Sequence, residues 1–189
     1  APMPEGIEDG IIHGLYPFRK TEVKKGMHEV TLLGSGSILM EVLKAQEMLA
    51  KDYDVAADVW NVTSYTELRR EALEVERWNM LHPMEKPRVP YIVNQLGVKG
   101  PIIAASDWMK ILADQIVRWV PNLYALGTDG FGRSDSRVAL RKYFEVDAAS
   151  IVVASLSQLM KHGKIEPKTV QKAIEALGVN PEKQSQTLF

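Results

Sequence analysis

The feature that most restricts the fold is the succession of a strand, a glycine-rich turn, a helix and a second strand over residues 28–62. Residues 28–33 are mostly β-branched and apolar, as in a strand, and Gly34-Ser35-Gly36-Ser37 ends that run. Ile38, Val42, Ala45 and Leu49 then recur at helical spacing on one face, and a second strand is expected over 55–62. A unit of this kind predicts two parallel strands joined by a crossover helix.

Alternation of helix and strand continues along the chain. Ser64 and Glu67 have the spacing of a capping box, which predicts a helix start. Short apolar strands are expected at 102–105 and 123–126. Between those strands, Asp107 is predicted to cap a helix that carries Met109, Leu112, Ile116 and Trp119 on its buried face.

Other segments are predicted as follows. Pro83, Pro87 and Pro90 are expected to prevent regular helix in a connecting segment. After residue 137 the pattern is mainly helical, although 151–153 would suit a strand by propensity alone. We therefore predict one α/β domain over 1–189, with a lead-in helix and strand in 1–22, a three-layer α/β/α arrangement, and a flexible tail at 183–189.

Composition excludes several classes of function. The formal net charge of −1 leaves no basic excess to attract nucleic acid or an anionic membrane. The absence of cysteine excludes disulfides and zinc–cysteine sites and fits a reducing cytoplasm. No apolar run approaches the roughly 18 residues that span a bilayer. Because the chain begins with Ala1-Pro2 rather than methionine, we expect a processed chain or a piece of a longer one.

The Gly34–Ser37 turn is the first candidate ligand site. It lies between a strand and a helix, where free backbone amides and the helix dipole favour an anion, so Ser35, Gly36 and Ser37 are candidate anion-binding residues. It lacks the lysine of a phosphate-binding loop and the full dinucleotide fingerprint. The simpler interpretation is a tight turn in which Ser35 or Ser37 caps the helix.

The glycine-rich loop at 127–137 is the second candidate. Its charged and aromatic residues, Asp129, Phe131, Arg133, Asp135 and Arg137, could bind a ligand, pack against a neighbouring domain, or form an Asp–Arg network anchored by Phe131. His82 could act as an acid or base, but a lone histidine at a helix end is more typical of a capping or hydrogen-bonding role. No nucleophile motif or metal-ligand spacing is present in the sequence.

Six segments carry a family resemblance: Gly-Ser-Gly-Ser-Ile at 34–38, Val-Thr-Ser-Tyr-Thr-Glu-Leu at 62–68, Glu-Arg-Trp-Asn-Met-Leu-His-Pro at 76–83, Pro-Arg-Val-Pro-Tyr at 87–91, Gly-Thr-Asp-Gly-Phe-Gly-Arg-Ser-Asp-Ser-Arg at 127–137 and Phe-Glu-Val-Asp at 144–147. In this order, over nearly the whole chain, they resemble the C-terminal part of homodimeric bacterial pyruvate dehydrogenase E1 components. That family belongs to the transketolase-like enzymes that depend on thiamine diphosphate.

The resemblance implies a fold and a parent enzyme. The fold would be a transketolase C-terminal-like sandwich with a five-stranded mixed sheet, and residues 16–21 are our candidate for its one antiparallel strand. The parent would be a cytoplasmic enzyme that uses thiamine diphosphate and magnesium to decarboxylate pyruvate. It would then pass the acetyl group to the lipoyl arm of the E2 dihydrolipoyl acetyltransferase. Its other partners would be its own N-terminal and middle domains and a second E1 subunit.

This chain departs from the family's cofactor signature, which begins Gly-Asp-Gly and ends Asn-Asn. The nearest approach is Thr128-Asp129-Gly130. We therefore assign no catalytic, cofactor-binding or metal residue, and expect a structural, dimer-supporting domain that is inactive alone and shows an exposed apolar patch where other domains pack. The alternative is a stand-alone regulatory module that binds a phosphate-bearing ligand at the Gly–Ser turn. An enzyme in its own right would need a convergent acid, base or nucleophile, and the sequence indicates none.

Overall fold

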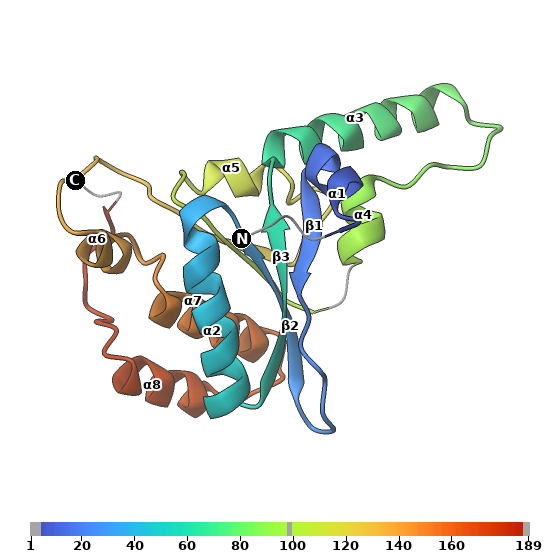
Figure 1. Cartoon of the computed structure of the whole chain (residues 1–189). Coiled ribbons are helices and arrows are strands. Elements are labelled where there is room, and N and C mark those ends of the chain that lie inside the picture. Colours follow the sequence, from blue (N-terminus) through green and yellow to red (C-terminus); the bar gives the residue numbers. More distant parts are fainter. Residues whose placement is uncertain (1–4, 98–99, 187–189) are drawn as a thin grey trace.

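A five-stranded mixed sheet forms the centre of the molecule in the computed structural model, which describes residues 5–97 and 100–186 (Figure 1). The strands lie in the order β1-β3-β2-β4-β5. Their bounds are β1 Leu15–Arg19, β2 His28–Gly34, β3 Val55–Val62, β4 Ile102–Ala105 and β5 Leu123–Leu126. Helices cover both faces, so the predicted three-layer α/β/α sandwich is confirmed.

Strand β1 is the one antiparallel member of the sheet. It pairs with β3, with Leu15 opposite Val62, whereas the β2–β3, β2–β4 and β4–β5 pairs are all parallel. The antiparallel strand predicted at 16–21 is therefore confirmed, although it ends at Arg19. Thr21 remains beside β3 through bonds from its amide to Asp58 Oδ1 (2.9 Å) and from its hydroxyl to the Ala57 carbonyl (2.8 Å).

The predicted βαβ unit is present. A short 3₁₀ turn, η1 (Gly36–Ile38), leads into α2 (Leu39–Asp52), and β2 and β3 run parallel with His28 opposite Val55. The face of this helix read from the sequence, made by Ile38, Val42, Ala45 and Leu49, is fully buried against the sheet.

The layer that contains α2 also holds α6 (Arg137–Phe144), α7 (Ala148–Lys161) and α8 (Pro167–Ala176). Residues 151–153 are helical, because the side chain of Asp147 accepts a hydrogen bond from the Ser150 amide (3.0 Å) and starts α7. The capping signal thus outweighs the strand propensity of the Ile-Val-Val run.

The opposite layer consists of α1 (Glu8–His13), α3 (Tyr65–Leu81), α4 (Tyr91–Leu96) and α5 (Ile111–Asp114). Ser64 caps α3 as predicted, accepting from the Glu67 amide at 3.1 Å. Helix α4 was not predicted. It begins directly after Pro90, whose fixed φ and missing N–H are tolerated at a helix start.

The helix predicted from Asp107 to Trp119 is wrong in extent. The α-helix α5 covers only Ile111–Asp114, its N-cap is Lys110, and Met109 is exposed rather than buried. The reason is a long-range contact, since Asp129 accepts a hydrogen bond from the Lys110 amide (3.1 Å) and delays the helix start. Asp107 caps nothing and faces the Gly–Ser turn instead.

The first part of the predicted flexible tail lies against the domain. Lys183 bonds the Tyr143 carbonyl and pairs with Glu145 (3.0 Å), and Gln186 is buried, donating to the carbonyls of Gly127 (3.3 Å) and Phe144 (3.5 Å). Residues 183–186 therefore differ from the prediction, and residues 187–189 lie outside the described residues.

Candidate functional site

The loops at the carboxyl ends of the parallel strands form one continuous region of the surface. The Gly–Ser turn follows β2, residues 106–110 follow β4, and residues 127–136 follow β5. Both candidate sites from the sequence therefore meet at the edge where open α/β sheets bind ligands.

The Gly–Ser turn is shaped by its first serine. The Ser35 amide donates to the Ala105 carbonyl (3.3 Å), and its hydroxyl donates to the Val62 carbonyl (3.0 Å). Ser35 thus connects the turn to the two neighbouring strands. It occupies the N-cap position of η1, but its side chain makes no capping hydrogen bond. Gly36 adopts a left-handed φ of +54°, a conformation that glycine takes without steric cost.

Ser37 faces a carboxylate and an arginine. Its hydroxyl donates to Asp107 Oδ2 (3.3 Å), and Arg141 donates to the Ser37 carbonyl (3.2 Å) and hydroxyl (3.4 Å). A side-chain cap is therefore absent at both Ser35 and Ser37, and Ile38 is the N-cap residue of α2. Because Asp107 lies in front of the turn, an anion at this place would meet a negative charge as well as the free end of the helix.

Arg141 is fixed by Glu41, a residue that sequence reasoning missed. Their ion pair measures 2.9 Å, and Glu41 also accepts from Lys44 (2.9 Å) and from the Ala148 amide (3.2 Å). Burial alone would raise the pKa of Glu41, but these hydrogen bonds and the charges of Lys44 and Arg141 outweigh burial and lower it. The position of Glu41 could have identified it from the sequence, because it lies three residues after Ile38 on the buried face of α2.

A cavity of about 610 Å³ lies between the turn and the 127–137 loop. Its polar lining consists of Ser37, Asp107, Thr128, Arg133, Asp135, Arg137 and Arg141. The structure thus brings together Ser37 from the first candidate site and Arg133, Asp135 and Arg137 from the second. Ser35, Asp129 and Phe131 do not line this cavity.

The 127–137 loop is not held by the predicted Asp–Arg network. Asp129 pairs with Lys110 (3.5 Å), the Arg133 guanidinium lies 4.3 Å from the centre of the Tyr143 ring, and Asp135 accepts from the Ser136 amide (2.6 Å). No Asp–Arg ion pair forms within this fully described loop. Phe131 is not an anchor, because it is 78% exposed.

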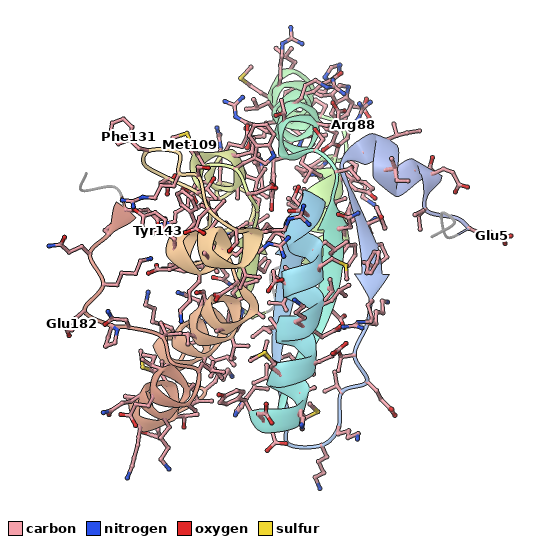
Figure 2. All side chains as sticks on the ribbon, turned by 60° about the vertical axis from the view of Figure 1, so that its left-hand side comes forward. Glu5, Arg88, Met109, Phe131, Tyr143 and Glu182 are labelled. Atoms are coloured by element: carbon pink, nitrogen blue, oxygen red, sulfur yellow. The ribbon has the colours of Figure 1, made fainter. Side chains whose placement is uncertain are left out.

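An exposed apolar face lies beside the cavity. Thr128 bonds the Trp108 carbonyl (2.8 Å), which joins the loop after β5 to the loop after β4. Figure 2 shows that Phe131 and Met109 lie on the same side of the molecule. The large exposed side chains of these two loops, here called the carboxyl-end face, are Trp108, Met109 and Phe131. A patch of this kind matches the one expected of a domain that packs on neighbours.

His82 lies outside this cavity. His82 bonds the Trp78 carbonyl through Nδ1 (2.8 Å) and stacks on the Trp78 ring, which confirms its predicted hydrogen-bonding role. Among residues 5–97 and 100–186, no group of three potential metal ligands occurs. Within the same ranges no helix is long and apolar enough to cross a membrane.

Fold and sequence together define the class. The model of the transketolase-like TK C-terminal domain family matches residues 14–147, so the chain belongs to that family. Two solved transketolases share the fold at low identity. That of Leishmania mexicana has a TM-score of 0.56 at 15% identity, over 81% of this chain and 19% of its own. One from Pichia stipitis has a TM-score of 0.58 at 14% identity, over 82% and 19%.

Two proteins with higher sequence identity to this chain share one name, pyruvate dehydrogenase E1 component. The pyruvate dehydrogenase E1 component of Pseudomonas aeruginosa is 51% identical over 186 residues, which is 97% of this chain and 21% of that protein. The protein of the same name from Escherichia coli K12 is 52% identical over 183 residues, 96% of this chain and 20% of its own. The resemblance noted from the six segments is confirmed, and the chain spans about a fifth of the length of these relatives.

Proposed function

We propose that this chain is the C-terminal domain of a pyruvate dehydrogenase E1 component and that its role is structural. The observation that carries the proposal is identity of about one half over nearly the whole chain to proteins of that name. The whole enzyme would decarboxylate pyruvate and transfer the acetyl group to the lipoyl group of an E2 dihydrolipoyl acetyltransferase. It would act in the cytoplasm as a homodimer.

The residues present do not fit the parent's cofactors. Thiamine diphosphate with magnesium requires carboxylate or carbonyl ligands for the metal. The one segment that approaches the family signature, 128–130, has its Asp129 carboxylate engaged by the amide and ammonium of Lys110. We therefore place both cofactors in other parts of the parent chain and derive no catalytic step from this domain.

The carboxyl-end face supports a packing role. Trp108 and Phe131 are 63% and 78% exposed, on loops held in place by Thr128 and Asp129. Large aromatic side chains on a fixed surface are typical of the centre of a protein interface. The preceding domains of the same parent chain are the proposed occupants.

An activity comparison tests this function. The 189-residue chain, shown to be folded by circular dichroism, is supplied with pyruvate, thiamine diphosphate, magnesium and ferricyanide, the oxidant that accepts the electrons in place of the lipoyl group, and CO₂ release is measured beside the full-length parent. We expect turnover from the parent only. Decarboxylation by the isolated chain would refute the structural assignment, and an inactive parent would refute the assignment to this enzyme.

A second candidate is a regulatory module that binds a phosphate-bearing ligand, and the convergence of Ser37, Arg133, Arg137 and Arg141 on one cavity favours it. Calorimetric titration with inorganic phosphate tests this candidate. If the chain is such a module, phosphate should bind saturably, and Ser37→Ala or Gly36→Val should abolish the binding. Asp107→Asn should strengthen binding, because it removes the carboxylate in front of the turn. No binding by either the native chain or Asp107→Asn would exclude a phosphate site here.

A further inference from the structure

The chain after α8 runs back beside α6 toward the 127–137 loop (Figure 1). Lys183 attaches this segment near the end of α6. Its ammonium donates to the Tyr143 carbonyl and pairs with Glu145 at 3.0 Å. A cation is favourable at this place, because the last carbonyls of a helix form the negative end of its dipole. We call residues 183–186 the latch.

The latch reaches the loop after β5 through its last residue. Gln186 is 7% exposed and donates to the carbonyls of Gly127 (3.3 Å) and Phe144 (3.5 Å). Its backbone packs on Gly130, where a Cβ would lie 2.2 Å from the Gln186 carbonyl oxygen. The 127–137 loop is therefore attached to the latch as well as to the loop after β4.

One aromatic ring links the latch to the cavity at the carboxyl ends of the strands. The ammonium of Lys183 lies 5.0 Å from the centre of the Tyr143 ring, and the guanidinium of Arg133 lies 4.3 Å from the same centre. Arg133 lines the cavity, and Phe131 in the same loop belongs to the carboxyl-end face. Displacing the latch would therefore change the surroundings of both the cavity and the face.

The attached position of the latch carries two energetic costs. The Oε1 atom of Gln186 is buried and has no hydrogen-bond partner, and an unpaired buried acceptor is unfavourable. Glu145 has a left-handed φ of +58°, which is uncommon for a residue with a side chain. Release of the latch would hydrate the Gln186 oxygen and free Glu145 from its ion pair. A segment with few contacts and such costs opens at a lower free energy than the core of a domain.

We propose that the latch is a conformational switch. When it is attached, it holds the 127–137 loop in the shape that lines the cavity and presents Phe131. When local unfolding releases it, the loop and Arg133 lose these contacts. A ligand or a neighbouring domain that binds only the attached form would keep the latch in place, because the two equilibria are linked. The inference goes beyond the proposed function, since it concerns contacts within this domain and applies to either occupant of the loop.

Hydrogen exchange in the native full-length chain, followed by mass spectrometry of its peptides, tests the switch. Gln186→Ala removes two bonds to carbonyls, and Gln184→Ala is the matched control, because Gln184 is an exposed glutamine of the same segment. The amides of Thr128 and Lys110 report on the loop, since both are hydrogen-bonded. We expect Gln186→Ala to speed exchange in their peptides roughly two- to tenfold and Gln184→Ala to leave it unchanged.

Peptides from β2 and α2 show whether the effect is local. Their exchange should remain native in both variants. Unchanged exchange around Thr128 in Gln186→Ala, or equal acceleration by Gln184→Ala, would overturn the proposal. Acceleration that extends to β2 and α2 would also overturn it, since residue 186 would then belong to the core and not to a switch.

Salt provides a second readout. Lys183 and Glu145 are 26% and 47% exposed, so dissolved ions screen their attraction. Raising the salt from about 20 mM to about 500 mM should speed exchange around Thr128 roughly two- to fivefold. Lys183→Met should exchange faster at low salt and show no such response, whereas Lys172→Met, which changes an exposed lysine of α8, should keep it. A salt response that persists in Lys183→Met would overturn the switch as assigned to this ion pair.

Discussion

Arg141 and Glu41 form an ion pair of 2.9 Å that joins α6 to α2, with only 15% and 8% of their side chains exposed. The pair connects the wall of the carboxyl-end cavity to the crossover helix of the βαβ unit. It also positions Arg141 over the Gly–Ser turn, where it donates to Ser37. The cavity therefore depends on a contact between residues far apart in the sequence.

Removing one partner of this pair should destabilise the domain. Glu41→Ala leaves Arg141 without its charged partner and the Ala148 amide without its acceptor, so we expect a loss of about 2–4 kcal/mol in the free energy of unfolding by urea. Lys44→Ala is the control, because Lys44 is 61% exposed, and it should cost less than about 1 kcal/mol. Equal losses in the two variants would contradict the assigned role.

The same carboxylate should contribute to the pH dependence of stability. The pKa of Glu41 in the folded state lies below its value in the unfolded state. Its contribution to the free energy of unfolding is therefore present above about pH 4.3, the ordinary pKa of glutamate, and is lost as the pH falls through the folded-state value. Urea unfolding from pH 6 to pH 3 should therefore be less pH-dependent in Glu41→Gln than in the native chain. Identical slopes of the unfolding free energy against pH in the two chains would refute this assignment.

A glycine should be required where the C-terminal segment crosses the 127–137 loop. Gly130 has a φ of +88°, and a Cβ there would lie 2.2 Å from the Gln186 carbonyl oxygen. Gly130→Ala should cost about 2–4 kcal/mol through strain and overlap. Both variants are compared with the native chain by thermal unfolding. Gly132→Ala, where a Cβ meets nothing within 4 Å, should leave the free energy of unfolding nearly unchanged. A neutral Gly130→Ala would mean that residue 186 does not pack there.

The carboxyl-end face should matter for assembly and not for folding. Phe131→Ser removes an exposed ring, so the unfolding free energy should change by less than about 0.5 kcal/mol. Mixed with the separately produced remainder of the parent chain, Phe131→Ser should bind less tightly than the native domain, whereas Val23→Ser, which changes an exposed residue before the amino end of β2, should bind equally well. Loss of folding in Phe131→Ser would show that the ring is part of the core.

Much of the fold was readable from local pattern. The α2 face from Ile38 to Leu49, the Ser64 cap and all five strands are encoded by spacing and by runs of apolar residues. Two of the failures share one cause, which is a contact distant in sequence. Asp129 shortens α5 by bonding Lys110, and Gln186 fixes a segment that composition alone predicts to be flexible.

The candidate site was predicted in parts but not as a whole. Ser37 and the arginines of the 127–137 loop were selected separately, and only the fold places them around one cavity. Glu41 and Arg141 were missed because no short motif identifies an ion pair between two helices 100 residues apart. The position of Asp107 in front of the turn likewise follows from sheet order and not from spacing.

The size of the native chain in its source cells tests the central claim most directly. An antibody raised against this domain would isolate it, and mass spectrometry would measure its intact mass. We predict a chain about five times larger than 21.2 kDa, since this sequence spans 21% of its relative. A native chain of about 21.2 kDa would contradict the assignment to a pyruvate dehydrogenase E1 component and leave the phosphate-binding module as the leading account.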